Sequence, residues 1–172
     1  MGELLSFVDR RMVDFNPGLW GWVTLTRFRV GRPASDAALL GALVREPRFE
    51  GLGYDVPEPH AADRILLGTR ARVHGRYRLS AVSASSYQRT TEDDARRELE
   101  TLAAVYEDPT PGVRAKLERD VFPLLHTPAL YRLADLGPKA DAGWTDFLHR
   151  FTEFVSVDIA HGVLVLIIGG HD

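Results

Sequence analysis

The stretch VSVDIAHGVLVLII, residues 155–168, decides the fold. Two runs rich in β-branched residues, 155–159 and 163–168, flank the short segment 160–162, whose glycine is typical of a hairpin loop. The second run is apolar at every position, and a strand that is apolar on both faces is usually buried on both. We therefore expect a hairpin whose second strand is central in the sheet.

A second apolar segment, LWGWVTLTRFRV at residues 19–30, predicts another strand because it is rich in aromatic and β-branched residues and ends at Gly31-Arg32-Pro33. Trp20 and Trp22 share one face of this strand. We expect them to pack inside the molecule. The alternative is contact with another chain, because tryptophan is enriched at protein interfaces.

Helices are predicted from apolar spacing and from capping residues. Ser35 is placed to cap a helix that runs to Glu46, and Thr91 with Asp94 forms a capping pattern for a helix over 92–106. The apolar residues of segment 3–15 recur at helical spacing and predict an N-terminal helix, which Asn16-Pro17-Gly18 ends, so that helix and stop occupy residues 1–18.

Further helices are expected near residues 111–122, 128–136 and 144–151. Residues 47–63, with three prolines and two glycines, predict a surface loop. Together these elements predict one α+β domain over residues 1–172. Its sheet would be mostly antiparallel, with about five strands and with helices packed on one face; a ferredoxin-like core fits this order by analogy.

Charge is distributed unevenly along the chain, although the net charge is only −3. Residues 64–91 contain six arginines and no acidic residue, whereas residues 92–172 contain 15 acidic and 8 basic residues. Like charges on neighbouring strands destabilise a sheet, so the arginine-rich segment needs an anionic partner. That partner is the best indication of function that the sequence offers.

The arginines flank a predicted hairpin tip at Val73-His74-Gly75. A three-residue loop with Gly75 in the left-handed conformation would pair Arg72 with Arg76, and this register separates apolar from charged residues best. One face would then carry the four predicted binding arginines, Arg70, Arg72, Arg76 and Arg78.

Arg27 and Arg29 would extend this arginine surface if strand 19–30 lies beside the hairpin. The surface has three possible partners: carboxylates of the same chain, such as Glu92, Glu98 or Glu100; another protein; or nucleic acid or a phosphorylated ligand, since guanidinium groups bind phosphate and carboxylate through paired hydrogen bonds.

Patterns that would indicate catalysis are weak. His149 and Glu153, with Asp146 one turn earlier, would lie on one side of a predicted helix, where a solvated face is a better interpretation than a metal site. Asp158 and His161 flank a hairpin tip and are explained as turn residues. The chain has no phosphate-binding glycine loop and no dinucleotide fingerprint, and we expect neither a cofactor nor a metal.

Composition bounds the compartment. The chain has no cysteine, which excludes disulfides and thiolate metal sites. It lacks the basic start of a signal peptide, and its longest apolar run is far short of the roughly 20 residues that cross a bilayer. We expect a cytoplasmic protein that has no membrane association.

The first functional hypothesis is a non-enzymatic binding or assembly protein. It would contact a protein partner, or a second copy, through the arginine face and the aromatic strand. The second is a nucleic-acid or phosphate-ligand binder that uses the same arginines. The third is a small hydrolase with a histidine and a carboxylate.

Overall fold

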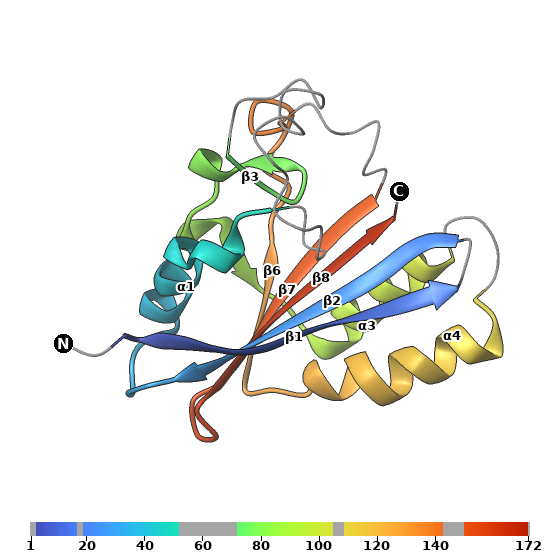
Figure 1. The fold of residues 1–172 in the computed structure, drawn as a ribbon, viewed down its shortest axis with the longest axis horizontal. Coiled ribbons are helices and arrows are strands. Elements are labelled where there is room, and N and C mark those ends of the chain that lie inside the picture. The colour runs from blue at the N-terminus through green and yellow to red at the C-terminus, as the bar shows by residue number, and fades with distance from the viewer. Residues whose placement is uncertain (1–2, 17–18, 52–71, 105–108, 143–149, 172) are drawn as a thin grey trace.

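The computed structural model describes residues 3–16, 19–51, 72–104, 109–142 and 150–171 (Figure 1). An antiparallel sheet organises these residues, with strands in the order β1-β2-β8-β7-β6-β5. These strands are β1 Leu5–Asn16, β2 Leu19–Val30, β5 Tyr87–Arg89, β6 Ala129–Leu133, β7 Arg150–Asp158 and β8 Val163–His171. Strand β8 lies between β2 and β7, so its predicted central position is confirmed.

The α+β class and the antiparallel sheet are confirmed, with six strands in the main sheet where about five were expected. A ferredoxin-like core is not confirmed. The predicted arginine-rich hairpin, β3 Val73–His74 and β4 Tyr77–Arg78, does not join the main sheet and forms a separate two-stranded sheet instead.

Helices cover both faces of the sheet, not one as expected. Helix α1, Asp36–Arg45, lies on one face, and helices α3, Glu92–Ala103, and α4, Pro111–Lys116, lie on the other (Figure 1). Strand β8 shows why. Its Leu164 and Leu166 belong to the apolar core under α1, whereas Val165 and Ile167 belong to the core under α3 and α4. A strand that is apolar on both faces needs cover on both.

The predicted caps of α1 and α3 are confirmed. Ser35 Oγ accepts a hydrogen bond from the Ala38 N–H at 3.3 Å, and Thr91 Oγ1 accepts one from the Asp94 N–H at 3.1 Å. Each satisfies a backbone donor that has no partner within its helix. Helix α4 continues through a π turn, Leu117–Val121, and a 3-10 turn, Phe122–Leu124, so the helix expected near 111–122 is also confirmed.

The predicted N-terminal helix is wrong, because residues 5–16 form strand β1 and pair with β2. The pairing register shifts between Phe7 and Asp9. Before this β-bulge Leu5 packs in the core under α1, and after it Val13 and Phe15 pack in the core under α3 and α4. The extra residue of a bulge reverses which positions face each side. The apolar residues therefore recur at a spacing that imitates a helix.

Of the two other helix predictions, the one near 128–136 is wrong. Residues 129–133 form β6 between β5 and β7, because Ala129 and Leu130 find cover on opposite faces of the sheet. The helix expected near 144–151 falls mostly on residues 143–149, which lie outside the described residues, while Phe151 belongs to β7.

The first residues of the predicted surface loop, 47–63, are not all at the surface. Pro47–Phe49 forms a 3-10 turn whose Phe49 is almost fully buried in the core under α1. Residues 52–63 lie outside the described residues.

Candidate functional site

The arginine-rich hairpin has a different register from the predicted one. His74 pairs with Tyr77 and Val73 pairs with Arg78, which leaves Gly75 and Arg76 as a two-residue turn. Gly75 has a φ of +52°, which suits the first central position of such a turn. Burial of His74 and Tyr77 decides the register, since both side chains face the core. Arg72 and Arg76 are therefore not cross-strand neighbours.

Two of the predicted binding arginines are neutralised by carboxylates of the same chain. Arg72 Nη2 lies 2.8 Å from Glu50 Oε2, and Arg76 Nη2 lies 2.8 Å from Asp141 Oδ2. The hydrogen bond that Arg76 donates to Asp141 raises the pKa of Arg76, and the bond that Arg72 donates to Glu50 raises the pKa of Arg72. Self-neutralisation was one of the expected outcomes, but the carboxylates are not those the sequence suggested.

Of the remaining predicted arginines, those that the structure describes are not brought together. Arg78 is exposed, and within the described residues its guanidinium makes no hydrogen bond or ion pair. Arg70 lies outside the described residues. Arg27, paired with Asp9 at 3.6 Å, and Arg29 occupy the same side of β2 as Leu25, which packs in the core under α3 and α4. The hairpin packs over the opposite face of the sheet, so these two arginines do not extend its surface.

The aromatic face of β2 is used for packing. Trp22 is buried in the core under α1, and its ring lies so close to Gly170 on β8 that a Cβ there would approach Trp22 Cζ2 to 2.4 Å. Trp20 belongs to the same strand, but its side chain lies outside the described part of the structure. Trp22 therefore packs inside the molecule, as the sequence predicts.

A buried polar network that the sequence does not reveal lies beneath the hairpin. Its members are His74 from β3, Tyr87 from β5 and Glu153 from β7. His74 Nε2 contacts Glu153 Oε2, and the Tyr87 hydroxyl donates to Glu153 Oε1 at 2.5 Å. His74 Nδ1 contacts the Phe49 carbonyl oxygen, and its ring stacks on the Phe49 ring at 3.5 Å between centroids.

The hydrogen-bond partners fix the number of protons in this network. A carbonyl oxygen only accepts, so His74 Nδ1 carries a proton. A second proton lies between His74 Nε2 and Glu153 Oε2, which makes the pair either imidazolium with carboxylate or imidazole with carboxylic acid. Either state is neutral overall, as burial of ionisable groups requires.

Tyr87 is the phenol of this network and stays protonated. Burial, followed by the nearby Glu153, raises the pKa of Tyr87 well above its ordinary value. Neither His74 nor Glu153 exposes any of its side chain. The network is therefore shielded from solvent. Its hydrogen bonds attach the hairpin and the Phe49 turn to the main sheet.

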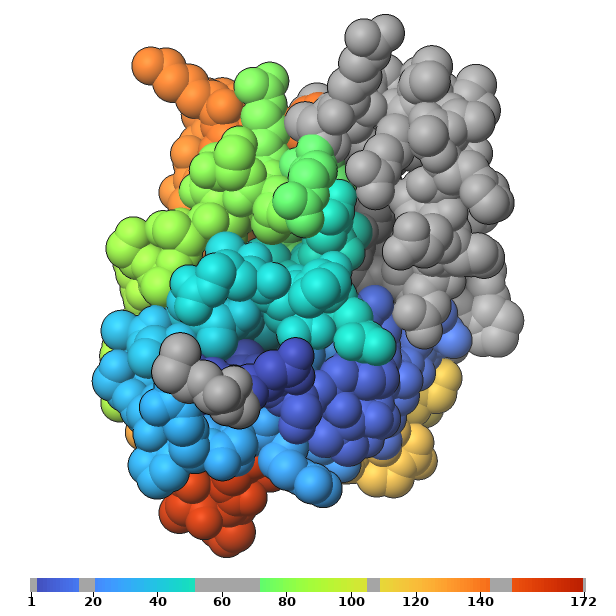
Figure 2. Space-filling model, turned by 60° about the vertical axis from the view of Figure 1, so that its left-hand side comes forward, coloured from blue at the N-terminus to red at the C-terminus, as the bar shows by residue number. Residues whose placement is uncertain are grey.

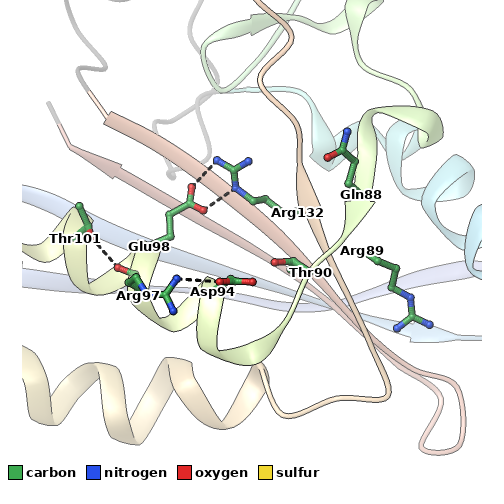
Figure 3. A pocket seen from close by; sticks show the side chains of 8 residues that line it. All are labelled: Gln88, Arg89, Thr90, Asp94, Arg97, Glu98, Thr101 and Arg132. Carbon is green, nitrogen blue, oxygen red and sulfur yellow. Dashed lines mark hydrogen bonds and ion pairs between the residues drawn. The ribbon is translucent and has the colours of Figure 1, made fainter.

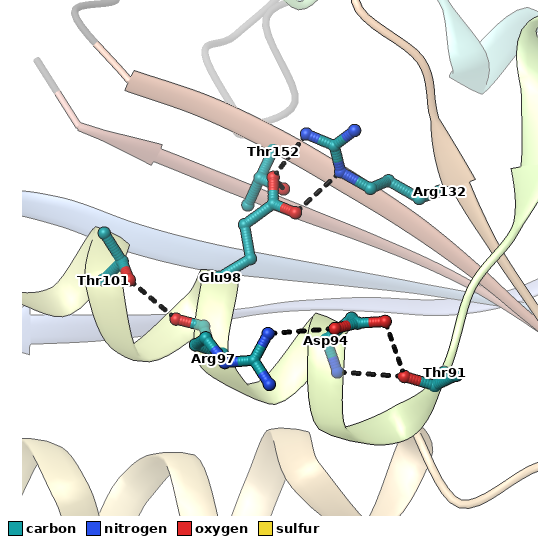
Figure 4. Close-up of polar contacts among 7 residues, drawn as sticks. All are labelled: Thr91, Asp94, Arg97, Glu98, Thr101, Arg132 and Thr152. Carbon is teal, nitrogen blue, oxygen red and sulfur yellow. Dashed lines mark hydrogen bonds and ion pairs between the residues drawn. The ribbon is translucent and has the colours of Figure 1, made fainter.

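A polar groove lies beside β5 and the first turns of α3, with a volume of about 460 Å³ (Figure 3). Its ionised groups are already paired. Arg132 on β6 holds Glu98 on α3 through two hydrogen bonds of 2.6 and 3.0 Å, and Thr152 donates to the same carboxylate at 2.6 Å (Figure 4). Asp94 and Arg97 pair at 2.9 Å. The groove thus offers a ligand few unpaired charges.

The other histidine–carboxylate combinations do not assemble a catalytic site. Asp158 and His161 do meet, with 2.7 Å between Oδ2 and Nδ1, in an exposed turn, where they close the β7–β8 hairpin as expected. Glu153 lies in a strand and is buried, so the solvated helix face predicted for it is wrong; His149 and Asp146 lie outside the described residues. Over the described residues, no three metal-binding side chains cluster.

The exposed large apolar side chains point to another surface. Among the described residues there are four of them, and three lie on β1: Phe7, Val8 and Met12, exposed by 37%, 45% and 50%. Strand β1 is the outermost strand of the sheet, and no other strand formed by the described residues lies on its outer side (Figure 1). Figure 2 shows this N-terminal segment, in dark blue, open at the surface beside α1.

Comparison of the chain with protein-family models, with curated proteins and with solved structures finds no match in any of the three. In the part of the chain that the structure describes, no helix has the length and apolar character needed to cross a membrane.

Proposed function

We propose that this chain is a non-enzymatic binding or assembly protein of the cytoplasm that contacts another protein chain through the outer edge of β1. One observation carries the proposal: a 12-residue strand at the end of the sheet bears three of the four exposed large apolar side chains of the described residues. An edge strand presents backbone N–H and C=O groups that a further strand can pair with.

The other end of the sheet supports the choice of edge. Strand β5 has only three residues, so it offers little backbone to a partner. Strand β1 has four times that length. Its backbone groups would supply affinity, and Phe7, Val8 and Met12 would supply apolar contact.

This proposal keeps the class of function that the sequence suggested and moves the surface from the hairpin to β1. The reason is charge. Arg72 and Arg76 already have carboxylate partners, and the register of the hairpin places Arg72 and Arg78 on different faces. Nucleic-acid or phosphate binding by these arginines loses its main support for the same reason.

A comparison of variants tests the surface. Tagged wild-type protein is compared with Met12→Lys on β1 and with Arg78→Ser on the hairpin, and bound protein is quantified, including untagged copies of the chain itself. We expect recovery to fall for Met12→Lys and to stay at the wild-type level for Arg78→Ser. Equal recovery with wild-type and Met12→Lys, or loss only with Arg78→Ser, would overturn the proposal.

A further inference from the structure

We propose that the partner of β1 is a second copy of this chain, paired antiparallel with Met12 of one copy opposite Met12 of the other. The inference rests on the proposed function, which it makes specific. It follows from the charges, the face and the regularity of one short segment, residues 10–14.

Regular pairing makes this segment suitable for strand addition. The β1–β2 register is shifted between Phe7 and Asp9 and again between Asp14 and Asn16. Between these shifts, Asp9 to Asp14 pair without interruption with Arg27 to Trp22 of β2. A neighbouring strand therefore meets a regular edge only here, because a bulge disrupts the ladder locally.

The direction of the backbone groups can be read from one contact. Lys116 Nζ donates to the carbonyl oxygen of Asp14 at 2.8 Å, and Lys116 belongs to α4, outside the β1–β2 ladder. The Asp14 carbonyl therefore points away from β2. Backbone groups alternate in direction along an antiparallel strand, so those of Arg10 and Met12 point outward as well. These three residues are the ones that a further strand would bond.

Two-fold symmetry limits the possible registers. Residues directly opposite in an antiparallel pair point to the same face of the sheet. Two copies of one strand can therefore meet only with a single residue on the two-fold axis. Within the regular segment the candidates for that residue are Asp9, Arg10, Arg11, Met12, Val13 and Asp14.

Charge selects Met12 as the residue on the axis. That register sets Arg10 of each copy opposite Asp14 of the other, so two opposite-charge pairs flank an apolar contact. Centring on any of the four charged residues, Asp9, Arg10, Arg11 or Asp14, places identical charges opposite each other, which destabilises a sheet. Centring on Arg10 also carries the pairing through the bulge. Centring on Val13 sets Met12 against Asp14.

The individual side chains suit this register. Met12 is half exposed, so pairing with a second copy would bury apolar surface. The Asp14 carboxylate makes no hydrogen bond or ion pair with any described residue. Arg10 is held in place, with Nε bonded to Thr26 Oγ1 at 2.9 Å and Nη2 to the Arg48 carbonyl at 2.7 Å.

Strand addition would displace Lys116 from the Asp14 carbonyl, because the N–H of the opposite Arg10 takes that position. Lysine over an edge is a common protection against pairing. Removing this protection should therefore favour the pair, and Lys116→Ala is expected to increase the fraction of dimer.

Cysteine cross-linking tests the register directly, because the chain contains no cysteine of its own. Opposite residues of a hydrogen-bonded antiparallel pair have Cα atoms about 5.5 Å apart, within the range of about 4.4–6.8 Å that a disulfide spans. Met12→Cys is expected to form a covalent dimer under mild oxidation. Ile159→Cys, in the β7–β8 turn, is the control and is expected to stay monomeric, since Ile159 is 40% exposed against 50% for Met12. Equal cross-linking of the two would overturn the inference.

Charge exchange provides a second, independent test by sedimentation. Arg10→Glu and Asp14→Arg should each abolish the wild-type dimer, because each brings like charges together. A mixture of the two should restore it as a heterodimer with two opposite-charge pairs. A mixture that remains monomeric, although both variants are folded by circular dichroism, would overturn the register.

The outcomes separate this inference from the proposed function. A wild-type chain that is monomeric at high concentration but recovers a different protein in a Met12-dependent manner would overturn self-pairing and support the function. A chain that is monomeric and recovers nothing would overturn both.

Discussion

The imidazole of His74 and the carboxylate of Glu153 meet in the core although 79 residues separate them in the chain, and neither side chain exposes any surface. The contact joins the small β3–β4 sheet to β7 of the main sheet. It explains why a hairpin of two-residue strands keeps a defined position. Two short strands alone are marginally stable, so they need an anchor of this kind.

Removing the carboxylate of Glu153 should be severe. Glu153→Leu leaves His74 and the Tyr87 hydroxyl without their common partner, and losing one member of a buried pair costs about 3–5 kcal/mol. Glu153→Gln is the matched control, because an amide can still accept from Tyr87 and donate to a neutral His74. We expect urea denaturation to show a much smaller loss for Gln than for Leu. Equal losses would contradict the network.

Tyr87 should make stability sensitive to alkali. Its pKa is raised in the folded protein, chiefly by burial, so the neutral phenol stabilises the fold below the ordinary tyrosine value of 10.0 and this contribution is lost as pH rises toward the folded-state pKa. Tyr87→Phe should flatten the alkaline limb of the stability–pH profile and cost about 1–3 kcal/mol at neutral pH. Thermal unfolding between pH 7 and pH 11 checks this; an unchanged alkaline limb would refute it.

Asp94 should contribute to sensitivity to acid. The hydrogen bond from Thr91, followed by Arg97, lowers the pKa of Asp94. Its stabilising effect is present above the ordinary value of 3.8 and is lost as pH falls through the lower folded-state value. Asp94→Asn should therefore lose less stability between pH 5 and pH 2 than wild type. Asp93→Asn, in the same helical turn, is the control and should behave as wild type does.

Neutralised arginines should become available when their carboxylates are removed. The double variant Glu50→Gln with Asp141→Asn leaves Arg72 and Arg76 without the ion pairs seen here. We expect wild type to elute from a heparin column at low salt and the double variant to elute at clearly higher salt. Tight, salt-sensitive binding by wild type would instead restore the arginines as an anion-binding surface.

The turn at Gly75 should tolerate no side chain. A Cβ at this position would lie 2.2 Å from the Phe151 ring, and the φ of +52° is unfavourable for other residues. Gly137 also has a positive φ, +72°, but a Cβ there would meet nothing within 4 Å. Gly75→Ala should therefore lower the melting temperature more than Gly137→Ala does, and the difference measures the clash with Phe151. Equal effects would argue against this packing.

Local signals in the sequence predicted local structure well. Strand 19–30 has the predicted bounds, and the helices capped by Ser35 and Thr91 begin where expected. The central place of β8 also followed from composition, because only a strand covered on both sides is apolar throughout. In each case the deciding interactions lie within a few residues of one another or affect a whole strand.

The sequence-based predictions fail where contacts between residues distant in the sequence determine the local structure. A single bulge after Phe7 makes the apolar residues of β1 imitate a helix, and nothing local marks it. The hairpin register depends on burial of His74 against Glu153 and Phe49, both remote in the sequence. The carboxylates that neutralise Arg72 and Arg76 are likewise brought in by tertiary folding. The buried network was missed because its three members share no spacing that a motif could reveal.

The pairing of β2 with β8 has a consequence for how the chain folds. Gly21 lies opposite His171, so this ladder joins segments from opposite ends of the described chain. Contacts between such distant segments slow folding, because a long loop must close before any of them is gained. The β1–β2 hairpin can form early from neighbouring residues, yet its inner edge stays open until β8 has been synthesised. During that interval Val23, Leu25 and Phe28 are exposed to other chains, and the nascent protein is then most prone to aggregate.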